Sequence, residues 1–219
     1  MFNSILRAAL ESYFLVSITT LYGLANSKFD SNEELITFMI GVVTVTYLVC
    51  FPIIQYRFLL RKHESLGEDF VKEKYGSLYT NVQHEKRHAL RFTLYFCMRR
   101  FAFALVICFL KESLVLQILA ADMAILGMLS FYVGGLPMSD KANNFIQIFN
   151  EIVVCSCIIS LVIFTDFIPN PVDRYEYGYT LLYVVATSIG VNVIILIATI
   201  LISIYNAISQ KIRKNRYTK

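Results

Sequence analysis

The stretch LITFMIGVVTVTYLVCFPIIQYRFLL, residues 35–60, carries no charged residue before Arg57. Crossing the hydrocarbon core of a membrane takes roughly 20 apolar residues in a helix, so this stretch alone is long enough to span. Comparable stretches follow one another along the chain at residues 8–24, 92–110, 114–136, 145–168 and 179–205. The pattern predicts an all-α, polytopic bundle of six transmembrane helices, with residues 8–24 as the shortest span.

The composition agrees with a chain that is mostly in lipid. Hydrophobic residues make up 57% and charged residues 16% of the 219 residues, whereas soluble domains are about half apolar and about a quarter charged. No soluble domain fits beside the spans, so we expect one domain over residues 1–219. The first seven residues are too short and too weakly basic for a signal peptide, so we expect the first span to be retained.

Positive charge is strongly segregated between the links that join the spans. The long second link, residues 61–91, and the tail after residue 205 are rich in lysine and arginine, whereas the links on the other side carry only Lys28, Lys111 and Arg174. The positive-inside rule then predicts that both termini and the second link are cytoplasmic. We expect these basic segments to meet anionic lipid headgroups and not nucleic acid, because the aromatic and basic interleaving of a nucleic-acid surface is missing.

The links on the outer side are short. Residues 169–178 contain two prolines and end in a glycine, a composition that predicts a surface turn. No outer link is long enough for a pore helix followed by a selectivity filter of the potassium-channel kind.

Among the polar residues inside the predicted spans, five stand out as candidates, because ionisable groups in lipid are functional candidates by default. A rise of 1.5 Å per residue places Arg99 and Arg100 roughly 11 Å, and Glu151 roughly 10 Å, from the inner ends of their spans. Asp122 falls near the midplane and Asn192 in the inner half of the last span. We expect Arg99 or Arg100 to pair with Glu151, with Asp122 close by, since arginine suits bidentate pairing with a carboxylate.

Such a cluster has two interpretations. It can be a buried clamp that fixes helix packing, or it can take part in gating or in an ion pathway. A cluster of mixed sign neutralises itself more readily than it conducts, which favours the clamp.

The second link contains His84-Glu85-Lys86-Arg87-His88, which matches the zinc-protease pattern H-E-x-x-H. On a helix, His84 and His88 would lie on one face as metal ligands. The charged residues between them and the absence of a clear third ligand favour a solvated segment next to the membrane instead. His84 and His88 are therefore weak metal candidates, and no cofactor is expected.

Several strings resemble a known family. They are KEKYGSLYTNV at residues 72–82, the paired arginines of the third span, QIFNEIVVCSCI at 147–158 and FTDFIP at 164–169. Together they resemble the C-terminal multi-spanning region of large ciliate surface proteins, which is loosely like transient-receptor-potential channels. The matching residues are Tyr75, Gly76, Ser77, Leu78, Tyr79, Arg99, Arg100, Asn150, Glu151, Phe164, Thr165, Asp166 and Phe167.

The resemblance implies a channel-like bundle or a membrane anchor. The Cys-rich extracellular repeats of that family are missing from these residues, which argues against a receptor or adhesion role. From the residues themselves, Gly76 is expected to mark a turn, and residues 64–79 to form an amphipathic helix with Tyr75, Leu78 and Tyr79 as anchors at the membrane interface.

Three functions remain open. The small size, the lack of soluble domains and the self-neutralising charges favour a non-catalytic accessory or structural subunit of a membrane complex. The alternative is a channel-like or transport-related bundle that assembles with copies of itself. A zinc hydrolase is the third. The expected partners are the lipid bilayer and other membrane subunits, or further copies of the chain.

Overall fold

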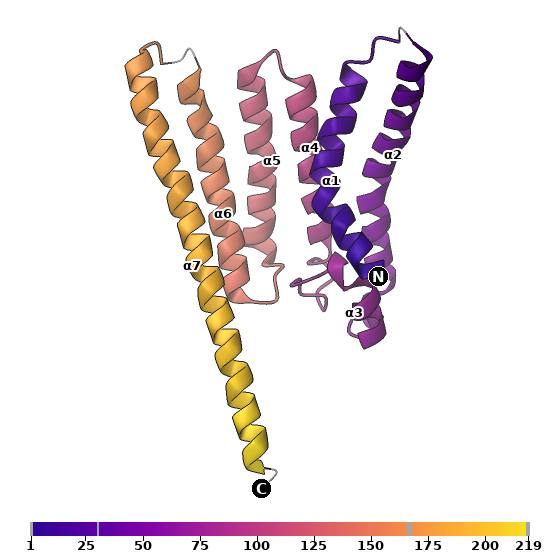
Figure 1. The fold of residues 1–219 in the computed structure, drawn as a ribbon, viewed down its shortest axis with the longest axis vertical. Coiled ribbons are helices and arrows are strands. Elements are labelled where there is room, and N and C mark those ends of the chain that lie inside the picture. The colour runs from indigo at the N-terminus through magenta and orange to yellow at the C-terminus, as the bar shows by residue number, and fades with distance from the viewer. Residues whose placement is uncertain (1, 30, 166–167, 218–219) are drawn as a thin grey trace. The chain divides into compact units, whose positions relative to one another are not determined.

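A computed structural model describes residues 2–29, 31–165 and 168–217 (Figure 1). The described residues form helices and no strand longer than an isolated bridge. Among them are six helices long and apolar enough to cross a membrane. The chain divides into two compact units, residues 1–165 and residues 166–219.

The first unit contains five of these helices and a helical link. The long helices are α1 (Phe2–Ala25), α2 (Asn32–Arg61), α4 (Arg91–Phe109), α5 (Leu114–Gly135) and α6 (Lys141–Ser160), which η3 (Leu161–Phe164) extends. Between α2 and α4 lie η1 (His63–Ser65), α3 (Asp69–Tyr75) and η2 (Gly76–Leu78). Helix α4 packs against α1, α2 and α5, and α6 packs against α5. Helix α4 is therefore the central element of the unit.

A proline inside α2 creates a backbone gap that α1 fills. Pro52 has no N–H, so the carbonyl of Leu48 one turn earlier lacks its helical donor. The hydroxyl of Tyr13, on α1, donates to that carbonyl at 2.6 Å, and both residues are buried. This bond therefore gives the carbonyl a donor from another helix and joins α1 to α2 beside the proline.

The second link is folded against the bundle and is not one amphipathic helix. Leu78 and Tyr79 are buried, with exposed fractions of 4% and 6%, so the expectation that they anchor the membrane interface is wrong. The Tyr79 hydroxyl donates to the Leu66 carbonyl at 2.8 Å, and burial raises the pKa of Tyr79 above its ordinary value. Apolar packing within the link outweighed the interfacial preference of the tyrosine ring.

The turn between α5 and α6 is held by the link and by its own asparagine. The backbone of residues 81–83 bonds to that of residues 137–139, with Val82 opposite Met138. Asn144, buried in the first turns of α6, accepts from the Met138 N–H at 3.0 Å and donates to the Met138 carbonyl at 2.9 Å. The turn of the α5–α6 hairpin is therefore fixed to the second link.

The second unit is one helix, α7 (Pro171–Tyr217), of 47 residues. At 1.5 Å per residue it is about 70 Å long, more than twice the roughly 30 Å of a hydrocarbon core. The expected surface turn at residues 169–178 is wrong from Pro171 onward. Proline is well tolerated at the first helical position, and the Asn170 side chain accepts from the Val172 N–H at 3.0 Å.

Candidate functional site

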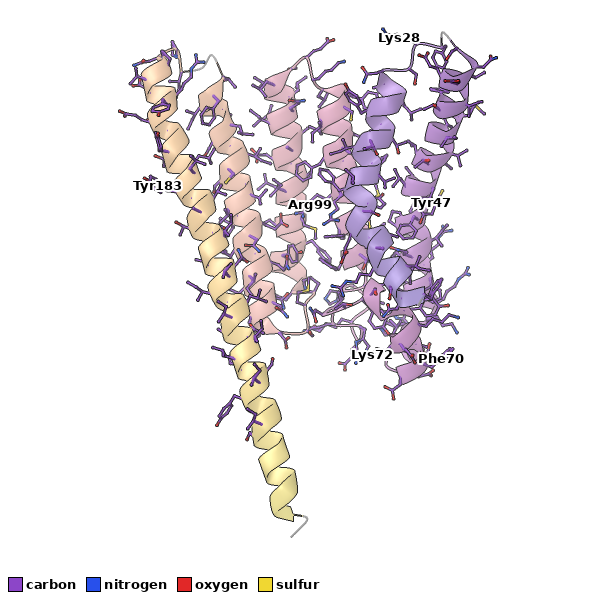
Figure 2. All side chains as sticks on the ribbon, in the orientation of Figure 1. Lys28, Tyr47, Phe70, Lys72, Arg99 and Tyr183 are labelled. Atoms are coloured by element: carbon purple, nitrogen blue, oxygen red, sulfur yellow. The ribbon has the colours of Figure 1, made fainter. Side chains whose placement is uncertain are left out.

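Two adjacent arginines on α4 point to different helices. Successive residues on an α-helix are about 100° apart around its axis, because one turn takes 3.6 residues. Arg99 reaches α6, where it pairs with Glu151, and Arg100 reaches α1, where it contacts the Leu10 carbonyl. Figure 2 labels Arg99 among the side chains of the bundle. The two side chains therefore belong to separate sites.

The first site is a buried ion pair. Arg99 Nη1 donates to Glu151 Oε1, and the side chains of the two residues are 21% and 6% exposed. This is one of the two pairings that the sequence allowed. Because α4 and α6 both pack against α5, the pair is a direct link between two helices that α5 otherwise joins. Arg99 Nε and Glu151 Oε2 are buried without a further hydrogen bond among the described residues.

Glu151 belongs to a polar stripe on α6 that faces α5 and α4. Asn144, Gln147, Glu151 and Cys155 follow one another at helical spacing. The Tyr132 hydroxyl of α5 donates to Gln147 Oε1 at 3.2 Å. Gln147, Asn144 and Tyr132 were missed as members of the site, although the spacing of three and four residues between polar positions on α6 could have shown the stripe.

Asp122 lies beside the ion pair and is not part of it. Cys155 Sγ lies 3.7 Å from Asp122 Oδ1, and Cys155 is one turn after Glu151 on α6. No basic group of the described residues lies within ion-pair distance of Asp122. The predicted cluster of mixed sign therefore consists of the Arg99–Glu151 ion pair, with the Asp122 carboxyl group about one helical turn away from it.

The remaining residues named from the sequence lie elsewhere. Asn192 is on α7 in the second unit, where its side-chain nitrogen donates to the Ser188 carbonyl at 2.9 Å. Asn150 is half-buried on α6, and Gly76 begins η2. The Tyr75 ring contacts the rings of Phe2 and Phe58. Asp166 and Phe167 lie outside the described residues.

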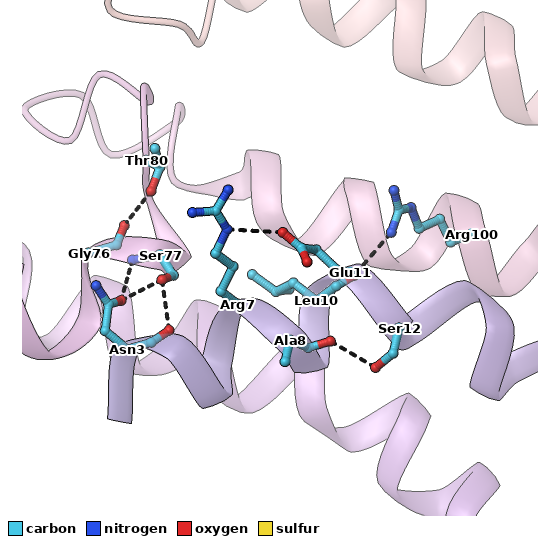
Figure 3. Close-up of polar contacts among 10 residues, drawn as sticks. All are labelled: Asn3, Arg7, Ala8, Leu10, Glu11, Ser12, Gly76, Ser77, Thr80 and Arg100. Carbon is cyan, nitrogen blue, oxygen red and sulfur yellow. Dashed lines mark hydrogen bonds and ion pairs between the residues drawn. The ribbon is translucent and has the colours of Figure 1, made fainter. Parts of the chain in front are cut away.

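The second site is a cavity of about 760 Å³ beside Arg100. Its walls come from the first turns of α1, the link from Leu66 to His84, the N-terminal half of α4 and Ser139. Figure 3 shows the polar contacts along this wall. Ser77 joins the link to α1, because its N–H donates to Asn3 Oδ1 at 2.8 Å and its hydroxyl to the Asn3 carbonyl at 2.9 Å.

The Arg100 side chain lines this cavity and has no carboxylate partner among the described residues. Its Nη1 donates to the Leu10 carbonyl at 3.0 Å, and its Cζ lies 4.0 Å from the centroid of the Phe96 ring. Within the described part of the chain, no carboxylate oxygen lies within 4.0 Å of its guanidinium. Arg100 thus has a dipole and an aromatic face beside it, but no full negative charge.

The H-E-x-x-H segment does not adopt the geometry of a zinc protease. Residues 84–88 form a series of turns, so the two histidines do not share a helix face. His88 Nε2 lies 3.2 Å from the Gly135 carbonyl, and the His84 ring lies 5.8 Å from that of Tyr79. The described residues contain no group of three or more potential ligands placed to hold a metal ion.

Comparison of the chain with family models, with curated proteins and with solved structures finds no match. The features that bear on its function are therefore the two arginine sites and the six apolar helices of the described residues.

Proposed function

We propose that the chain is an integral membrane protein whose six apolar helices cross the bilayer, with both termini and the second link in the cytoplasm. We propose further that it serves as a non-catalytic accessory or structural subunit of a membrane complex. The length and apolar character of the six helices support insertion. The segregation of lysine and arginine supports the orientation.

The observation that carries the subunit role is that α7 forms the second unit by itself, with no other long helix of that unit to pack against among the described residues. Its most apolar stretch is also more apolar than that of any of the other five candidate spans found among the described residues. Ala186 and Gly190 are four residues apart on this helix, and a Cβ added to Gly190 would meet no atom within 4 Å. Small residues at this spacing let another transmembrane helix approach closely.

The closed ion pair supports a structural role over conduction. Arg99 and Glu151 neutralise each other between α4 and α6, which leaves neither charge free to bind a passing ion. A channel-like assembly of identical copies is the second candidate. Asp122 favours it, because this carboxyl group lies inside the α5–α6 hairpin without an ion-pair partner among the described residues.

The test is the native mass of the protein extracted in mild detergent, with the co-purifying proteins identified. We expect an assembly of fixed composition that contains other proteins. Gly190→Leu should remove those proteins, because the side chain would block close approach along α7. Gly127→Leu is the matched control, since Gly127 on α5 also has open space around its Cβ position.

A discrete assembly of identical copies that holds no other protein would contradict the subunit role. Ion flux through that assembly in vesicles, lowered by Asp122→Asn, would establish the channel-like alternative. The resemblance to the membrane region of ciliate surface proteins stays a proposal, and it is compatible with either assembly.

A further inference from the structure

We propose that the cavity beside Arg100 binds a phosphate group, with the Arg100 guanidinium as its main ligand. The phosphate can come from the headgroup of an anionic membrane lipid or from a soluble phosphate compound, since both present the same chemistry to the cavity. This binding site goes beyond the proposed subunit role and does not depend on it.

The charge of the cavity wall favours an anion. Arg7, Lys72, His84 and Arg100 line it, and Glu11 is the one carboxylate among the lining residues. Arg7 Nε donates to Glu11 Oε1 at 2.9 Å, so that carboxylate is already matched by a cation. Lys72 and Arg100 then leave the cavity with an unmatched positive charge.

The position of Arg100 within an apolar helix makes this unmatched charge energetically unfavourable. An arginine inside an apolar span is costly, and such residues pair with opposite charges or backbone carbonyls or face a water-filled cavity. Its neighbour Arg99 has the carboxylate of Glu151, whereas Arg100 has only the Leu10 carbonyl and the Phe96 ring within the described residues. Arginine carries five N–H donors in a planar fork that matches phosphate oxygens, so donors remain for a ligand.

The size and lining of the cavity fit a headgroup with part of its chains. A volume of about 760 Å³ lies within the range of roughly 300–1,000 Å³ of small-molecule sites. Leu10, Phe92 and Phe96 give the wall an apolar part beside Arg100, and Ser77 and Thr80 give it a polar part. A molecule with a phosphate and short apolar chains can satisfy both parts at once.

The test measures binding to the full-length protein in mild detergent by native mass spectrometry. Three probes are added separately: dioctanoyl phosphatidic acid, dioctanoyl phosphatidylcholine as a lipid of no net charge, and inorganic phosphate. We expect phosphatidic acid to bind at least tenfold more tightly than phosphatidylcholine. Weak binding of inorganic phosphate would identify a lipid as the source, and binding as tight as that of phosphatidic acid would identify a soluble phosphate compound.

Variants then locate the site. Arg100→Gln should weaken phosphatidic acid binding by about tenfold or more, because a hydrogen bond to a charged group is lost. Arg87→Gln is the control, since Arg87 is an exposed cation that does not line the cavity. If Arg100→Gln does not fold, Lys72→Gln is measured instead. Lys72 is exposed, and its loss should weaken binding by about fivefold, as for one basic residue near a membrane surface.

Two results would overturn the proposal. One is equal binding of phosphatidic acid and phosphatidylcholine, with no binding of inorganic phosphate. The other is a loss of binding in Arg87→Gln as large as the loss in Arg100→Gln or, where that variant does not fold, in Lys72→Gln. Neither result bears on the partner proteins of α7, so failure of this proposal is distinguishable from failure of the subunit role.

Discussion

Arg99 and Arg100 are neighbours in sequence and lie in different surroundings. Arg99 is matched by a carboxylate from within the chain, on α6. Arg100 faces α1 and a cavity, where a backbone carbonyl and an aromatic ring contact it. Rotation about the axis of α4 gives the two adjacent charges different neighbours, so that Arg99 is a structural element while Arg100 is the proposed ligand-binding residue.

The largest expected effect in this comparison comes from the Arg99 side. Glu151→Gln leaves Arg99 as a buried cation without its partner, and breaking a buried pair in this way costs about 3–5 kcal/mol. The measurement is the unfolding of the purified protein in mild detergent. Glu112→Gln, in the exposed α4–α5 turn, is the control and should unfold as the unmodified protein does. Equal stability of the two variants would show that the ion pair holds nothing together.

A smaller difference in stability is expected between variants of two buried tyrosines, Tyr13 on α1 and Tyr132 on α5. Tyr13→Phe removes the donor to the Leu48 carbonyl, which Pro52 has left without a helical partner, and a buried acceptor left unsatisfied costs about 1–3 kcal/mol. Tyr132→Phe removes a 3.2 Å bond to the Gln147 side chain, which can reorient, so its loss should be smaller. Unfolding of both variants in detergent checks the order, with exposed Tyr22→Phe as the control.

Tyr79 gives a prediction for the link that lines the Arg100 cavity. Its pKa is raised by burial, so the folded state favours the neutral phenol. That contribution to stability is complete below the ordinary tyrosine pKa of about 10 and is lost as the pH rises through the higher value in the folded protein. Tyr79→Phe should cost about 1 kcal/mol at neutral pH.

The same variant should also flatten the fall in stability above a pH of about 10. Unfolding measured on both sides of that pH checks the two parts of the prediction. An unchanged alkaline fall in Tyr79→Phe would show that other groups cause it.

The smallest effect is expected at the exposed pair of the cavity rim. Arg7 and Glu11 have side chains that are 75% and 68% exposed, and exposed pairs four residues apart on a helix are worth about 0.3–0.5 kcal/mol. Arg7→Gln should therefore change the unfolding midpoint barely at all. A loss of stability as large as that of Glu151→Gln would contradict the prediction that the exposed pair contributes less than the buried pair.

The sequence predicted the six apolar helices well, because a length of about 20 apolar residues leaves few alternatives. It also brought Arg99 or Arg100 together with Glu151, since all three lie at similar depth in their spans. It could not decide between the arginines, because a step of one residue turns the side chain by about 100°, and the neighbours of α4 follow from packing. The buried apolar core of the link was missed as well, because the same apolar residues, Leu78 and Tyr79 among them, are expected both in an interfacial helix and in a folded link.

Proline has opposite consequences at the start of α7 and inside α2. Pro169 and Pro171 predict a turn from the sequence, but Pro171 occupies a first helical position, where its missing N–H has no partner to lose. Inside α2, by contrast, the missing N–H of Pro52 calls for a donor from another helix. No pattern within α2 could identify that donor as Tyr13.

The most direct test of the difference between the two arginines is a charge exchange with Glu151. Glu151→Arg alone should prevent folding in detergent, because it places a second cation beside Arg99. The double variant Arg99→Glu with Glu151→Arg should restore a folded protein, whereas Arg100→Glu with Glu151→Arg should not. Rescue by Arg100→Glu, or no rescue by Arg99→Glu, would contradict the assignment of Arg99 to α6 and of Arg100 to the cavity.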